Sequence, residues 1–184
     1  RHDLSLKPPR KTMLDLLKDA GRDVIAVGKI FDIFDGEGVT EKIKTTGNTN
    51  GIAFTKALQT RDFEGLAFVN LVDFDMLYGH RRDVAGYAAA ATEFDKFVAD
   101  FIPGMREGDI LMVTADHGCD PSYTKTTDHT REYVPYLICG KGVKPGVDLG
   151  TRLCFGTIAQ TICDYLGVDA STLDGQSVLS DILK

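Results

Sequence analysis

The 184-residue sequence lacks the features that mark several specialised classes of protein. No apolar run approaches the roughly 20 residues that a membrane-spanning helix needs, and the first residues do not begin a signal peptide. Internal repeats and low-complexity stretches are also missing. We therefore expect one globular, cytoplasmic domain with no membrane partner.

Positive charge is scarce. The 21 Lys and Arg residues are outnumbered by 27 Asp and Glu residues, which gives a formal net charge of -6. A chain with this balance repels a phosphate backbone, so nucleic-acid binding is not expected, although a local basic patch can still bind a small anion.

Cysteine is also sparse, and no CxxC pair is present. This spacing does not indicate a disulfide framework or a structural zinc site, so the four cysteines are predicted to be reduced thiols. Cys119 alone lies in a loop rich in candidate functional residues, and we interpret it as a neighbour of the site. The others are Cys139, Cys154 and Cys163.

Short apolar runs alternate with amphipathic segments along the chain, a pattern typical of an α/β fold. We predict a three-layer α/β/α sandwich with a mostly parallel sheet, whose ligand sites lie beyond the carboxyl ends of the strands. Pro135 places the last strand near a sheet edge, and residues 31–49 form a long irregular segment. The predicted strands are 24–28, 66–72, 109–114 and 134–139, and the predicted helices are 13–20, 51–59, 83–101 and 152–166.

Acidic and imidazole side chains gather after the predicted strands. Asp75 and His80 follow the second strand, the adjacent pair Asp116 and His117 follows the third, and His129 lies in the next loop. The sequence has only four histidines, and three of them are in this set. The isolated strand-end residue Asp73 is interpreted instead as a turn or capping residue.

These side chains are chemically suited to divalent metals. Mixed carboxylate and imidazole ligands favour Mn²⁺, Zn²⁺ or Fe, and a set without thiolate argues for catalytic rather than structural metal. Asp75, His80 and His129 are predicted to bind one ion. Asp116 and His117 bind a second, with Gly118 permitting the sharp turn that this requires.

Two such ions about 4 Å apart would suit phosphoryl transfer, and basic side chains for a phosphate lie in the same strand-end loops. Arginine can bind a phosphate through two parallel hydrogen bonds and lysine as a point charge. The alternative, a solvated surface charge, stays open for these residues. The candidates are Lys29, Arg81, Arg82, Lys125 and Arg131.

The metal motifs resemble those of the alkaline phosphatase superfamily, and longer strings resemble the phosphopentomutase family. These strings are KPP at 7–9, GKIFDIF at 28–34, VDFDMLYGHRRD at 72–83 and TDHTREYVP at 127–135. The resemblance implies a cytoplasmic isomerase of pentose phosphate and nucleotide metabolism that interconverts ribose or deoxyribose 1-phosphate and 5-phosphate. It also implies two Mn²⁺ ions, with Mg²⁺ or Zn²⁺ as alternatives, a sugar bisphosphate activator, and Lys29 on the substrate phosphate.

Other readings remain open beside this resemblance. They are another superfamily member, such as a cofactor-independent phosphoglycerate mutase or a phosphohydrolase, and a metal-binding module without catalysis.

The resemblance also implies missing parts. Members of the family are about twice as long, and their N-terminal part supplies a further metal-binding Asp, the nucleophilic Thr and a cap domain. Arg1–Asp3 resembles the stretch where the family's chain returns from cap to core. We therefore expect residues 1–184 to be the C-terminal portion of the catalytic core, with no nucleophile assigned. Its N-terminal remainder is then an expected partner, and the chain alone is expected to be inactive.

Overall fold

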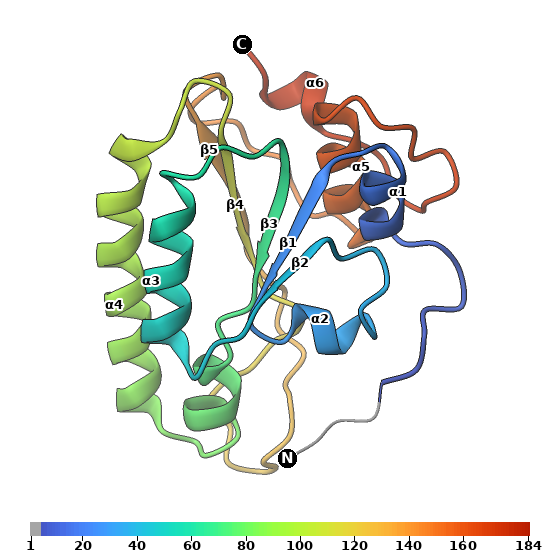
Figure 1. Ribbon diagram of the computed structural model, residues 1–184. Coiled ribbons are helices and arrows are strands. Elements are labelled where there is room, and N and C mark those ends of the chain that lie inside the picture. The colour runs from blue at the N-terminus through green and yellow to red at the C-terminus, as the bar shows by residue number, and fades with distance from the viewer. Residues whose placement is uncertain (1–4) are drawn as a thin grey trace. The chain divides into compact units, whose positions relative to one another are not determined.

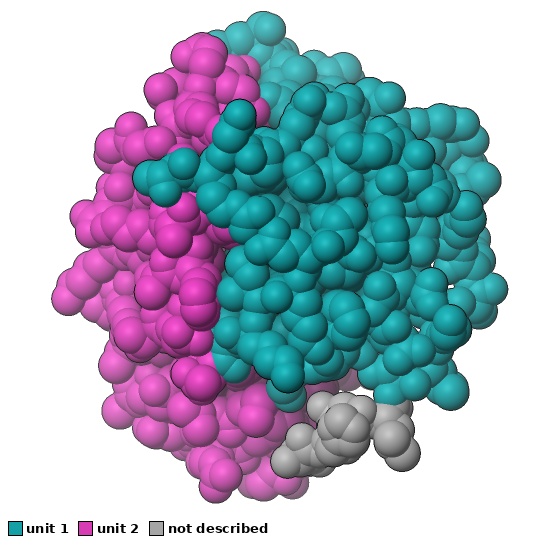
Figure 2. Space-filling view, in the orientation of Figure 1, with its two compact units in different colours: residues 1–45, 60–70, 144–184 teal, residues 46–59, 71–143 magenta. Residues whose placement is uncertain are grey.

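A computed structural model describes residues 5–184, so the predicted return from cap to core at Arg1–Asp3 lies outside the described residues. The chain divides into two compact units (Figure 2). Unit 1 comprises Arg1–Thr45, Thr60–Asn70 and Lys144–Lys184, and unit 2 comprises Thr46–Gln59 and Leu71–Val143. The chain passes from one unit to the other four times, and no local pattern in the sequence marks these crossings.

Unit 1 is built on a parallel sheet of three strands in the order β2-β1-β3. Its central strand β1 spans Asp23–Val27, and β2 and β3 span Glu41–Ile43 and Gly65–Val69. Four of the five residues of β1 are buried, as expected for a short apolar run between two parallel neighbours. The prediction of a parallel sheet is confirmed for these strands.

Helices of unit 1 pack on this sheet. Leu14 and Leu17 of the first helix are fully buried and share a core with Cys163 of the fifth. Figure 1 shows these two helices side by side next to β1. The helices are α1 (Met13–Asp19), α2 (Ile30–Ile33), α5 (Gly156–Tyr165) and α6 (Leu179–Ile182).

Unit 2 combines two long helices with a two-stranded antiparallel sheet. The ring of Phe74 contacts Tyr87 and Phe94, which lie on one face of α4, as the helical spacing predicted. None of the helices in residues 5–184 has both the length and the apolar character needed to cross a membrane. The elements are α3 (Asn48–Leu58), the π-helix η1 (Phe74–Gly79), α4 (Val84–Phe101), the 3-10 helix η2 (Ile102–Gly104), β4 (Ile110–Thr114) and β5 (Tyr136–Gly140).

Two details differ from the sequence-based expectation. Residues 31–49 are not wholly irregular, because they contain most of α2 and all of β2. Elements of four and three residues are too short to give a detectable hydrophobic period. In addition, β5 is antiparallel to β4 and begins one residue after Pro135. This start fits the lack of a proline N–H donor for a strand ladder.

Replacing Leu17 with alanine should test the core of unit 1. Because Leu17 is fully buried, we expect Leu17→Ala to lower the free energy of unfolding by about 2–5 kcal/mol, through lost transfer energy and a cavity. Leu6 is 90% exposed, so Leu6→Ala is the matched control and should change it by less than about 0.5 kcal/mol. Urea denaturation measures both, and equal losses in the two variants would contradict this account of the core.

Candidate metal centre

Asp75 and His80 are brought to the same side by the π-helix η1. The backbone N–H of His80 donates to the carbonyl of Asp75 at 3.0 Å, which is the i→i+5 bond of a π-helix. In an α-helix, side chains five residues apart point about 140° away from each other. The approach of these two side chains, which are five residues apart, therefore depends on an unusual local conformation.

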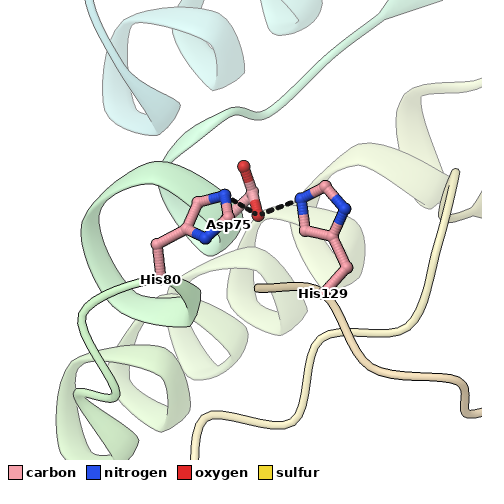
Figure 3. Close-up of side chains that lie close together, drawn as sticks. All are labelled: Asp75, His80 and His129. Atoms are coloured by element: carbon pink, nitrogen blue, oxygen red, sulfur yellow. Dashed lines mark ion pairs between the residues drawn. The ribbon is translucent and has the colours of Figure 1, made fainter. Parts of the chain in front are cut away.

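His129 reaches the same point from the loop between β4 and β5. The Nε2 atoms of His80 and His129 each lie 3.3 Å from Oδ1 of Asp75, and Figure 3 shows both rings directed at this one oxygen. The three potential ligand atoms lie within 4.8 Å of one another. The side chains predicted to share one metal are thus together, and each is between 32% and 42% exposed, which leaves access from solvent.

The orientation of the His80 ring favours a metal ligand. Its Nδ1 lies 2.5 Å from the backbone carbonyl of Thr127. A carbonyl can only accept a hydrogen bond, so Nδ1 donates to it and Nε2 is the ring nitrogen that faces Asp75. Metal-binding histidines commonly donate their second N–H in this way. Two imidazole nitrogens and one carboxylate thus form a donor set that fits a divalent ion.

Asp116 and His117 follow β4 after one intervening residue, Ala115, and lie beside this cluster. Nε2 of His117 is 3.6 Å from Oδ1 of Asp116. The rings of His117 and His129 stack with centroids 3.6 Å apart and planes 16° from parallel. The second predicted ligand pair therefore borders the first set, and Asp116, with a side chain 73% exposed, is open to solvent.

Gly118 is required for a different reason from the one predicted. Its φ is not in the left-handed region, and the chain bends at Asp116 and His117. A Cβ on Gly118 would lie 2.7 Å from the backbone nitrogen of Glu132 and 2.8 Å from the carbonyl of Thr130. The missing side chain therefore allows the segment after His129 to pair closely with the segment after β4.

Asp73 has the structural role predicted for it. Its Oδ2 accepts a hydrogen bond from the backbone N–H of Asn48 at 2.7 Å, and its own N–H donates to Oδ1 of Asn48 at 2.9 Å. Asn48 is the first residue of α3, where a carboxylate satisfies an N–H group that has no partner within the helix.

The thiols behave as the sequence predicted, since all four cysteines are free. Sγ of Cys119 lies 3.9 Å from Oδ1 of Asp75. Burial, followed by the charge of Asp75, raises the pKa of the Cys119 thiol. The protonated thiol is a poor metal ligand, which agrees with its interpretation as a neighbour of the site.

The predicted phosphate-binding residues are distributed over both units. Lys29 follows β1 in unit 1, whereas Arg81 and Arg82 follow η1 in unit 2. The side chain of Arg81 is exposed, but the guanidinium of Arg82 is hydrogen-bonded to main-chain carbonyls. The hydrogen bonds of Arg82 to main-chain carbonyls and the hydrogen bond between His80 and the carbonyl of Thr127 were not predicted from the sequence. These bonds join residues that are far apart in the sequence, so no local pattern indicates them.

Comparison with known proteins shows the family of this chain. The model of the Metalloenzyme superfamily matches residues 2–170, and the chain belongs to this superfamily. Within it, the resemblance to phosphopentomutases is confirmed. The chain is 54% identical over its full length to the phosphopentomutase of Lachnoclostridium phytofermentans and 52% identical to that of Acetivibrio thermocellus. It spans about half of these curated relatives, 47% of each.

A solved structure confirms the fold. A phosphoglycerate mutase of Leishmania mexicana, crystallised at low cobalt concentration, superposes with a TM-score of 0.69. The match covers 89% of this chain and 38% of that one at 17% identity. At this identity the likeness shows only the α/β fold of the alkaline phosphatase type, as predicted.

Replacing Gly79 with alanine should test the packing between η1 and the loop after β4. A Cβ on Gly79 would lie 2.3 Å from Sγ of Cys119 and 2.9 Å from the carbonyl of Phe74. We expect Gly79→Ala to lower the free energy of unfolding by about 1–3 kcal/mol through overpacking. Gly142 has open space around its Cα, so Gly142→Ala is the control and should be nearly neutral.

A second substitution can show whether the clash comes from the sulfur of Cys119 or from the carbonyl of Phe74. Cys119→Ala removes the sulfur atom, so Gly79→Ala should be less destabilising in that background than in the original chain. Denaturant titration of the four variants measures this coupling. An equal effect of Gly79→Ala in both backgrounds would show that Cys119 does not limit the approach.

Proposed function

We propose that the parent enzyme is a phosphopentomutase and that residues 1–184 are the C-terminal portion of its metal-binding core. Such an enzyme interconverts ribose or deoxyribose 1-phosphate and the corresponding 5-phosphate. One observation carries the proposal: two imidazoles converge on one carboxylate oxygen in a chain about half identical, over its full length, to proteins named phosphopentomutase.

In this proposal Asp75, His80 and His129 hold one divalent ion, and Asp116 and His117 contribute to a second. We favour Mn²⁺, as the resemblance to phosphopentomutases implies, with Mg²⁺ and Zn²⁺ as alternatives. A set of imidazole nitrogen and carboxylate oxygen donors is compatible with Mn²⁺. When bound, the ions would stabilise the attacking and leaving oxygens of the transferred phosphoryl group and offset charge at phosphorus. The stacking of His117 on His129 supports adjacent ion sites.

Substrate phosphate is assigned to Lys29 and Arg81. Lys29 lies after a parallel strand, where ligands of α/β folds bind. Arg81 follows His80 in the sequence, and its side chain is exposed. A direct phosphate contact by Arg82 stays a prediction, since its donors already bind main-chain carbonyls.

The remaining parts are assigned to the N-terminal portion of the parent enzyme. These are the phosphorylated threonine, a further metal-binding Asp and the cap domain, with a sugar bisphosphate as activator. The relatives are about twice as long as this chain, which supports a division of the active site along the sequence.

An activity assay should test the function. We expect the chain alone with Mn²⁺ to give no isomerisation of ribose 1-phosphate above background, because it has no assigned nucleophile. Addition of the N-terminal portion, or use of the full-length parent, should restore formation of ribose 5-phosphate. Strong turnover by the chain alone would contradict the missing nucleophile, and release of inorganic phosphate without isomerisation would favour a phosphohydrolase.

Metal binding can be tested on the chain itself. Asp75→Asn should weaken Mn²⁺ binding by about 100-fold, because the oxygen shared by both imidazoles loses its charge. Glu107 is an exposed carboxylate of the same unit, so Glu107→Gln loses the same charge and should leave the affinity unchanged. Isothermal titration calorimetry measures both. Equal affinities of the two variants would reject the assignment of Asp75, for an enzyme and for a non-catalytic metal-binding module alike.

A further inference from the structure

The guanidinium of Arg82 is fully engaged with the backbone of its own unit. A guanidinium has five N–H donors, and five hydrogen bonds to carbonyl oxygens use them. Nε donates to Thr126 at 2.8 Å, Nη1 donates to Gly79 and to Asp120 at 3.1 Å each, and Nη2 donates to Thr126 and Asp128. All five donors are thus directed at main-chain carbonyls of the same unit.

The four carbonyls belong to the two segments that carry the metal-ligand candidates. Gly79 directly precedes His80, and Asp128 directly precedes His129. Thr126 is followed by Thr127, whose carbonyl orients the ring of His80. A single side chain therefore joins the end of η1 to the loop that holds the third ligand.

The loop from 119 to 129 contains no helix or strand, and residues 122–129 are all exposed. At its end, the ring of His129 stacks on that of His117, and the N–H of Thr130 donates to the carbonyl of Gly118 at 3.1 Å. Apart from Arg82, the side-chain contacts of the loop with η1 and His80 come from the site itself: His80 to Thr127, Cys119 to Asp75 and His129 to Asp75. Arg82 thus supplies most of the hydrogen bonds that join the end of η1 to this loop.

The backbone of Arg82 also departs from the usual conformation. Its φ is 56°, one of two positive values among non-glycine residues in the described chain, and its N–H donates to the carbonyl of Gly79 at 3.1 Å. A left-handed conformation is unfavourable for a residue that carries a Cβ, because the Cβ comes too close to the following carbonyl oxygen. Strain of this kind persists where surrounding interactions fix it, and it concentrates at functional sites.

We propose that Arg82 is a positioning residue that holds His129 against Asp75 and His80 and so preorganises the three-ligand site. The inference rests on the proposed metal site and adds a component to it. The charge of Arg82 acts in the opposite direction, because a guanidinium repels a nearby cation. Loss of Arg82 should therefore strengthen metal binding if charge alone matters, and weaken it if Arg82 positions the ligands.

Two substitutions test this difference in sign. We expect Arg82→Met to weaken Mn²⁺ binding about 10–100-fold, the usual effect of losing a group that orients a metal ligand. Arg82→Lys keeps the charge but has three donors at one nitrogen, so it should also bind more weakly than the original chain. Arg81→Met, which loses the same charge without losing a hydrogen bond, should stay within about threefold. Calorimetry without substrate measures all three, and an Arg82→Met affinity equal to or above that of the original chain would overturn the proposal.

A double-mutant cycle separates positioning from general stability. If Arg82 acts through His129, Arg82→Met should have almost no further effect on Mn²⁺ affinity in a His129→Ala background. A visible-absorption titration with Co²⁺ adds a spectroscopic readout. The bands of Arg82→Met should resemble those of His129→Ala, because both lose the same imidazole. Additive losses of affinity in the cycle would contradict action through His129.

Hydrogen exchange of the metal-free chain keeps this inference distinct from the metal assignment. Amides of residues 120–129 should exchange faster in Arg82→Met than in Arg81→Met, whereas amides of β1 should be unchanged. Unchanged exchange in that loop would overturn the positioning role even if the metal site is correct. Failure of the original chain to bind Mn²⁺ would reject the metal assignment, while faster loop exchange would still support the contact role of Arg82.

Discussion

The local structure of unit 2 depends on the approach of two imidazoles to one carboxylate oxygen. The two Nε2 atoms lie 3.3 Å from Oδ1 of Asp75, although one histidine is near in sequence and the other is 54 positions away. The near one needs a π-helical turn, and the distant one needs a loop held at a fixed place. An arrangement of this kind is ready for a cation, because the donor atoms already face a common point and little ordering remains for the binding step.

Several residues that look unrelated in the sequence allow the segments that carry the two histidines to come close together. Gly79 and Gly118 lack side chains where neighbouring backbone or sulfur atoms come within 3 Å of a Cβ position. Arg82 adds hydrogen bonds between the same segments. Polar main-chain groups, rather than apolar packing, thus hold the loop. This difference explains why the loop can stay exposed to solvent, since it does not need to bury its side chains.

The two units differ in what stabilises them. Unit 1 has the buried strand β1 and the fully buried leucines of α1, whereas every residue of β4 and β5 is only partly buried or exposed. The metal-ligand candidates belong to unit 2, and the candidate phosphate ligand Lys29 belongs to unit 1. The chain spans about half of the phosphopentomutases that it matches.

The sequence by itself determined the repeating order of strands and helices and the chemistry of the ligand set. Apolar runs such as 24–28 must be buried, and carboxylate and imidazole side chains after strands can bind divalent metals whatever their exact geometry. It also determined that Asp73 differs in role from Asp75, through the usual preference of aspartate for caps and turns.

Only the tertiary structure decided how the site is held together. The π-helical bond between Asp75 and His80, the close approach at Gly118 and the five hydrogen bonds of Arg82 join residues through space. A sequence pattern reports the average environment of a residue, whereas these contacts depend on where the backbone of a distant segment lies. For this reason Arg82 resembled a phosphate ligand in the sequence, and its hydrogen bonds became visible only in the folded chain.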